Sequence, residues 1–87
     1  MLGRQTAKER IASFLLHIAE RSDAEEGLAF DLPMSRQDIA DYLGLTIETV
    51  CRMLSELKRD RVIAIPNVGQ VVLNDMDALG SLAEGGE

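Results

Sequence analysis

The segment 46–59 places polar side chains of the kinds that read DNA bases at helical spacing. With about 100° between successive helical residues, one side of this segment carries Ile47, Glu48, Cys51, Arg52 and Ser55. The apolar residues on another side are Val50, Leu54 and Leu57. In the major groove, arginine pairs with guanine, glutamate accepts from cytosine, and small apolar groups touch thymine methyl groups. The spacing therefore predicts a helix that packs by one face and reads DNA with the other.

Two other interpretations of this face stay open. Glu48 and Arg52 are four residues apart, so they also fit a surface ion pair worth a few tenths of a kcal/mol. Helix-turn-helix geometry also occurs in modules that bind only protein. The net charge of −6, with acidic residues gathered in segment 23–26 and in the C-terminal tail, favours an acidic protein-interaction module as the alternative function.

No set of residues indicates an enzyme or a metal site. His17 has no second histidine and no serine or cysteine with an acid beside it, so we interpret it as a partly exposed helical histidine. Asp23, Glu25 and Glu26 lack the spacing of an EF-hand and fit a solvated loop. Cys51 is the only cysteine, which excludes an internal disulfide and a cysteine-rich zinc or iron–sulfur site within this chain. We expect no catalytic residue, no metal and no cofactor.

The segment 35–59 carries the start and stop signals of two short helices. Ser35 is followed three residues later by Asp38, a variant of the capping box that begins a helix. Gly44 suits the end of that helix, and Thr46 caps a further helix that runs to about Arg59. Two helices joined by so tight a turn predict a helix-turn-helix.

The flanking segments supply the remaining elements. Apolar residues at spacings of three and four predict a long amphipathic helix over 5–22, and residues 28–32 alternate like a short edge strand. Residues 62–73 form two β-branched runs around a Pro/Gly turn, which predicts a hairpin, or wing. Asn74 fits the N-cap of a short last helix within 74–87. The predicted fold is mainly α with a small β-hairpin (α+β), a winged helix-turn-helix.

Length and charge limit the possible classes further. The 87 residues make one small domain, 1–87. A net charge of −6 is unusual for a nucleic-acid binder, but residues 35–61 carry five cationic and five anionic side chains, so a local patch can still meet a polyanion. No apolar run approaches the roughly 20 residues of a spanning helix. The N-terminus has no signal-peptide pattern, so we expect a cytoplasmic protein of bacterial type without membrane contact.

The segment Ser35-Arg-Gln-Asp-Ile-Ala-Asp-Tyr-Leu-Gly-Leu-Thr-Ile-Glu-Thr-Val-Cys-Arg-Met-Leu54 resembles the helix-turn-helix of Crp/Fnr-type transcription regulators, in their FixK-like branch. Residues 2–12 resemble the start of that family's DNA-binding domain, and residues 62–73 resemble its wing. The resemblance implies that Arg52 reads guanine and Glu48 reads cytosine in a TTGAT-like half-site, with Ile47 and Cys51 beside thymine methyl groups. The phosphate contacts it implies come from Ser35, Arg36, Gln37, Thr46 and Thr49.

The same resemblance implies partners. These are double-stranded DNA with a palindromic operator, a second copy of the full-length regulator in a homodimer, and RNA polymerase. The family's N-terminal sensor and dimerisation helix do not fit in 87 residues, so we expect an excised domain or a truncated regulator that is a monomer.

Cys51 departs from the serine that is common in the Fnr-like pattern, and it has two interpretations. As a hypothesis, oxidation of a thiol on the reading face adds bulk or charge that the phosphate-lined groove repels. Alternatively, cysteine is simply a small side chain that fits the groove.

Overall fold

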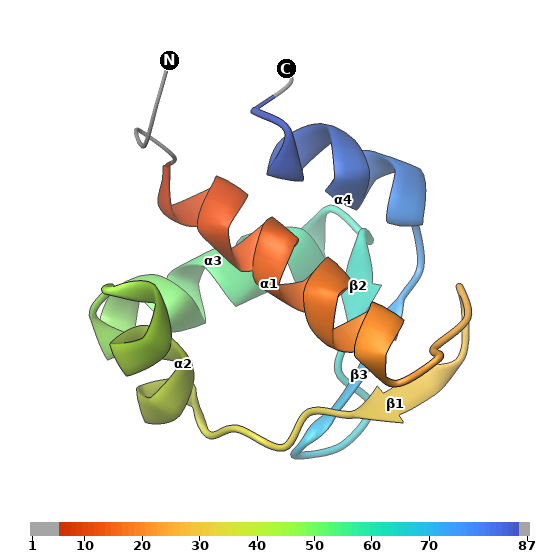
Figure 1. The fold of residues 1–87 in the computed structure, drawn as a ribbon, viewed down its shortest axis with the longest axis horizontal. Helices are drawn as coiled ribbons and strands as arrows, with labels where there is room; N and C mark the ends of the chain where they lie inside the picture. The colour runs from red at the N-terminus through yellow and green to blue at the C-terminus, as the bar shows by residue number, and fades with distance from the viewer. Residues whose placement is uncertain (1–5, 86–87) are drawn as a thin grey trace.

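The computed structural model describes residues 6–85, and its first element is the helix α1, Ala7–Arg21 (Figure 1). Thr6 is the N-cap. Its hydroxyl accepts from the Glu9 N–H at 3.1 Å, while the Thr6 N–H donates to the Glu9 carboxylate at 2.8 Å, a complete capping box. The predicted helix 5–22 is therefore confirmed with narrower limits, because Thr6 and Ser22 are its caps. Gln5 and the other residues of segment 1–5 lie outside the described residues.

The helix-turn-helix follows the predicted signals. Helix α2 spans Arg36–Leu43, with Ser35 as N-cap and Gly44 as C-cap in the left-handed conformation at φ 72°. Helix α3 spans Ile47–Arg59, with Thr46 as N-cap. Only Gly44, Leu45 and Thr46 separate the two helices, so the turn between them is tight, as predicted.

The small sheet has three strands rather than the two of the predicted hairpin. Its strands are β1, Ala29–Asp31, β2, Ile63–Ala64, and β3, Gln70–Leu73, in the order β1-β3-β2. The hairpin β2–β3 is the predicted wing. The third strand, β1, pairs antiparallel with β3, placing Phe30 opposite Val71. The strand expected at 28–32 is thus an edge strand of the same sheet.

The last helix, α4, spans Met76–Ala83 and lies alongside α1. The prediction of Asn74 as its N-cap is wrong, because Asp75 accepts from the Ala78 N–H at 3.0 Å. The Glu26 carboxylate also accepts from the Met76 N–H at 2.7 Å, at this same helix start. Glu26 therefore holds the loop after α1 to α4, a structural role that its interpretation as a solvated residue missed.

One apolar core joins all of these elements. Helix α1 packs against both α3 and α4, and α2 packs against α3. The largest fully buried side chains are Ile11, Leu15, Ile39, Leu57, Ile63, Leu73, Leu79, Val50 and Val71. Met34, Met53 and Met76 are partly buried against this cluster, where flexible methionine side chains can fill irregular gaps. Within residues 6–85 no helix has the length and apolar character needed to cross a membrane.

Candidate nucleic-acid interface

The exposed face of α3 carries the predicted base-reading side chains. Glu48, Cys51, Arg52 and Ser55 are exposed, and Ile47 has 41% of its surface accessible. The opposite face is closed, since the accessible fractions of Val50, Leu54 and Leu57 are 0%, 3% and 1%. The helix therefore packs by its apolar side and presents the polar set to solvent, as the helical spacing predicted.

Glu48 and Arg52 do not pair with each other. Among residues 6–85, the ion pairs within 4.0 Å are Lys8–Glu56 and Arg59–Asp60. The interpretation of Glu48 and Arg52 as a surface ion pair is therefore wrong for this conformation. Glu48 therefore remains available to a hydrogen-bond donor, and Arg52 remains available to a hydrogen-bond acceptor.

The N-termini of α2 and α3 have side-chain caps that leave other amides open. Ser35 accepts from the Asp38 N–H, and Thr46 accepts from the Thr49 N–H, each at 3.1 Å. The hydroxyls of Thr46 and Thr49 are also hydrogen-bonded to each other at 2.9 Å. Because the first N–H groups of a helix have no intrahelical partner and carry partial positive charge, both ends suit an anion such as a phosphate.

The predicted phosphate-contacting residues of α2 differ in how they are held. The Gln37 amide donates to the Asp41 carboxylate at 2.9 Å, so it already has one partner on its own helix. Arg36 is half-buried and lines a hollow between the start of α2 and the wing, with Pro66, Asn67 and Val68 on the other side. The sequence analysis did not select these three wing residues, although it predicted the Pro/Gly turn that contains them.

In the turn at the tip of the wing, residues 66–68 are exposed to solvent. Val68 is fully accessible, an unusual environment for an apolar side chain, and Gly69 takes the left-handed conformation at φ 83°. The Asn67 amide donates to the Gln70 side chain at 3.1 Å, which closes the loop. The wing therefore ends in a small, uncharged tip beside the start of α2.

Two cationic side chains of α1 contact the two helices of the helix-turn-helix. The Lys8 ammonium lies 2.8 Å from the Glu56 carboxylate of α3, and the Arg10 guanidinium donates to the Leu43 carbonyl of α2 at 3.0 Å. The hydrogen bond from Lys8 lowers the pKa of Glu56 below its ordinary value; desolvation opposes this shift, and the charges of Lys8, Arg59 and Arg52 add to it. Sequence reasoning missed both contacts because they join residues far apart in the chain.

Comparison with known proteins gives this arrangement a family. The profile of the Crp-like helix-turn-helix domain matches residues 9–82. The chain belongs to the Crp-like helix-turn-helix family. This confirms the resemblance to Crp/Fnr-type regulators that its sequence suggested.

Individual relatives of this Crp-like domain agree with the family assignment. The chain is 46% identical over 93 residues to the transcriptional activator protein FnrL of Cereibacter sphaeroides, covering 100% of the chain and 37% of FnrL. It is 51% identical over 85 residues to the nitrogen fixation regulation protein FixK of Azorhizobium caulinodans, covering 94% of the chain and 34% of FixK. These relatives are regulators by name, which agrees with the prediction that the chain is not an enzyme. The chain spans about a third of the length of these curated relatives.

A solved structure supports the same fold. The chain resembles FixK2 from Bradyrhizobium japonicum with a TM-score of 0.83 and 48% sequence identity, over 93% of this chain and 40% of that one. The winged helix-turn-helix and the FixK-like branch predicted from sequence are therefore confirmed.

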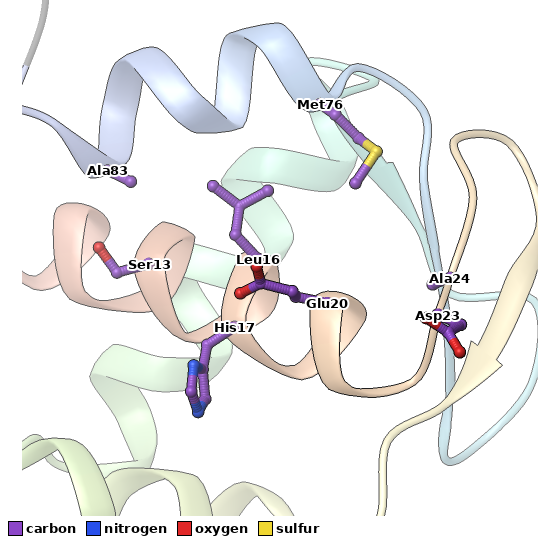
Figure 2. Close-up of a pocket in the computed structure, with 8 residues that line it drawn as sticks. All are labelled: Ser13, Leu16, His17, Glu20, Asp23, Ala24, Met76 and Ala83. Carbon is purple, nitrogen blue, oxygen red and sulfur yellow. The ribbon is translucent and has the colours of Figure 1, made fainter.

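The Crp-like domain also has a hollow on the side of α1 that faces α4, lined by Ser13, Leu16, His17, Glu20, Asp23, Ala24, Met76 and Ala83. Figure 2 shows Leu16 directed toward α4 and the His17 ring directed away from it. His17 is exposed, as predicted for an isolated helical histidine. No group of three or more potential metal ligands occurs within residues 6–85.

Proposed function

We propose that this Crp-like domain is the sequence-specific DNA-binding module of a transcription regulator, with α3 as its recognition helix. The observation that carries the proposal is the exposure of Glu48 and Arg52 on the N-terminal half of α3, opposite a closed apolar face, with no ion pair to either among residues 6–85. A helix-turn-helix inserts this half of its second helix into the major groove.

Each residue of the reading set has a chemically suitable target. Arg52 donates two hydrogen bonds to the O6 and N7 atoms of a guanine, and Glu48 accepts from the N4 amino group of a cytosine. Ile47 and Cys51 lie beside them on the exposed face and contact thymine methyl groups. Together with the family resemblance, these pairings favour a TTGAT-like half-site.

The DNA backbone is held by the two helix N-termini and by the wing. Ser35, Thr46 and Thr49 frame the amide ends of α2 and α3, which bind phosphate oxygens, while Arg36 and Gln37 supply side-chain donors. Many of these contacts use neutral donors, and few use cations. We therefore expect a shallower salt dependence than for a strongly basic DNA-binding domain, in keeping with the net charge of −6.

The proposed target is a palindrome read by two copies of a longer regulator. A symmetric dimer presents two recognition helices to half-sites one helical turn apart. A monomeric domain meets one half-site at a time, so it binds more weakly because effective concentration is lost. RNA polymerase is the proposed protein partner of the full-length regulator.

The testing experiment is fluorescence anisotropy of the domain against a labelled TTGAT-NNNN-ATCAA duplex and a scrambled duplex of equal composition. It is made at two salt concentrations under reducing conditions. We expect tighter and salt-sensitive binding to the palindrome. Equal binding to both duplexes, persisting after the domain is fused to a dimerising coiled coil, would contradict the proposal.

Cys51 allows a second arm of the same experiment. Its thiol is exposed on the reading face, so peroxide can reach it. Under the oxidation hypothesis, treated protein loses affinity for the palindrome, and a Cys51→Ser variant keeps its affinity. Unchanged binding, with Cys51 oxidation verified by mass spectrometry, would leave cysteine as a side chain that merely fits the groove.

The acidic surface keeps a protein-binding role as the second candidate. Residues such as Glu25, Asp31 and Asp77 are exposed and lie outside the helix-turn-helix. A module that acts only through this surface would bind neither duplex, even as a dimer. The same anisotropy experiment therefore separates the two functions.

A further inference from the structure

The first turns of α1 contact both helices of the helix-turn-helix. Lys8 reaches Glu56 in the C-terminal half of α3, at 2.8 Å. Arg10 reaches the carbonyl of Leu43, the last residue of α2, at 3.0 Å across 33 positions of sequence. The capping box of Thr6 and Glu9 fixes the same turn of α1 internally. The start of α1 is therefore a rigid support from which two cations hold two different helices.

The contact made by Arg10 lies where α2 ends. The last carbonyls of a helix have no intrahelical partner. At this end the Ala40 carbonyl accepts from the N–H groups of Gly44 and Leu45, and the Leu43 carbonyl accepts from the Arg10 side chain instead. A cation at the C-terminus of a helix is also favoured by the helix dipole. Arg10 thus supplies one hydrogen bond of the turn from a helix outside the motif.

We propose that Arg10 is a positioning residue for DNA reading, which rests on the function proposed above. Leu43 is three residues before Thr46, the N-cap of α3, so fixing its carbonyl fixes the turn and the direction in which α3 starts. Hydrogen bonds to base edges tolerate only a few tenths of an ångström. A small rotation of α3 therefore costs the contacts of Glu48 and Arg52 more than it costs contacts to phosphates.

The planar guanidinium is suited to this task. It is partly buried, and it presents several N–H groups in a fixed fork, whereas lysine offers a compact charge on a flexible stem. Glutamine retains a donor but loses the charge. The two substitutions therefore separate the charge from the geometry of the donor.

The experiment compares Arg10→Gln and Arg10→Lys with the same changes at Arg21, an exposed residue in the last turn of the same helix. Affinity for the palindromic and scrambled duplexes is measured at a temperature where circular dichroism finds every variant folded. We expect Arg10→Gln to lose about tenfold in affinity for the palindrome, the size expected for one charge-assisted hydrogen bond. Its affinity for the scrambled duplex is expected to change less than about twofold, because phosphate contacts carry no sequence information. Arg10→Lys is expected to recover part of the loss, and both Arg21 variants are expected to match the wild type.

A readout without DNA accompanies these measurements. The Leu45 N–H donates to the Ala40 carbonyl at 2.9 Å inside the turn, so its hydrogen exchange reports how firmly the turn is held. We expect exchange at Leu45 to be about tenfold faster in Arg10→Gln, while amides in the centre of α1 keep their rates.

The outcomes divide cleanly. Unchanged exchange at Leu45, or equal losses on both duplexes in a folded Arg10→Gln variant, would overturn the positioning role. A wild-type domain that fails to prefer the palindrome even when fused to a dimerising coiled coil would instead overturn the proposed function, and the exchange measurement then decides by itself whether Arg10 fixes the turn.

Discussion

The two faces of α3 differ in what they contribute. On one face Val50, Leu54 and Leu57 are closed against the core. On the other, Glu48 and Arg52 are exposed to solvent and do not form an ion pair with each other. Burial of the first group stabilises the fold through the hydrophobic effect, while exposed side chains contribute little to the free energy of unfolding. A single helix thus separates stability from recognition, and substitutions can alter one without the other.

The largest effect is expected on the buried face. Leu54→Ala removes buried methyl groups and leaves a cavity, so it is expected to lower the free energy of unfolding by about 2–5 kcal/mol. Urea denaturation followed by circular dichroism measures this change. The adjacent exposed residue provides the control, since Ser55→Ala is expected to stay within about 0.5 kcal/mol of the wild type. A similar decrease in the free energy of unfolding for both variants would contradict the proposed difference between the two faces.

The opposite result is expected for Arg52→Ala. It should weaken binding to the palindrome by about 1–3 kcal/mol and relax the preference at the guanine it reads, while the urea midpoint stays unchanged. Lys58→Ala, also exposed on α3 but near its C-terminus, is the matched control. If Arg52→Ala weakened binding to palindromic and scrambled duplexes equally, Arg52 would be a phosphate contact rather than a base reader.

A smaller and less selective effect is expected for Arg36→Ala, at the start of α2. As a proposed phosphate contact, Arg36 should support binding to all sequences alike. Its removal is expected to reduce the slope of log affinity against log salt by about 0.9. Anisotropy titrations over a series of salt concentrations test this, and an unchanged slope would remove Arg36 from the backbone contacts.

The smallest effect on stability is expected at Glu56, whose ion pair with Lys8 joins α3 to α1. Its pKa is lowered below the ordinary value of 4.5, chiefly by the hydrogen bond from Lys8. The stability that this contact supplies is therefore present above the unfolded-state pKa and is lost as the pH falls through the lower, folded-state pKa. The free energy of unfolding of Glu56→Gln should lie slightly below that of the wild type at neutral pH and converge with it in acid. A constant difference between Glu56→Gln and the wild type from neutral pH down to acid would contradict this role of the Lys8 contact.

Local signals in the sequence were sufficient for the helix-turn-helix. Ser35, Gly44 and Thr46 each act on the backbone within four residues of themselves, so their identities fix where α2 starts and stops and where α3 starts. The exposure of the reading set followed from helical spacing alone. The Thr6–Glu9 capping box was equally readable, because a threonine followed three residues later by glutamate is its signature, but the prediction overlooked it.

Contacts between distant segments could not be obtained in this way. Asn74 and Asp75 are both suitable N-cap residues, and contacts with distant segments determine which of them caps α4. The Val62 carbonyl accepts from the N–H groups of both residues, and the Glu26 carboxylate accepts from the Met76 N–H. The pairing of β1 with β3 likewise depends on how the whole chain folds. Arg10 precedes the buried Ile11 and looks like an ordinary solvated cation until α2 is placed beside it. The roles of the reading and phosphate-contacting residues stay predictions.

The strand order has a mechanical consequence for the helix-turn-helix. The chain enters the motif from β1 and leaves it into β2, and both strands are hydrogen-bonded to the same central strand, β3. Both ends of the helix-turn-helix are therefore attached to the same small sheet, which restrains hinge motion at either end. The sheet thereby sets the spacing between α3 and the wing. A DNA site whose groove and backbone do not fit that fixed span must deform to be bound, so the stiffness of the DNA enters the choice of target even at base pairs that no side chain touches.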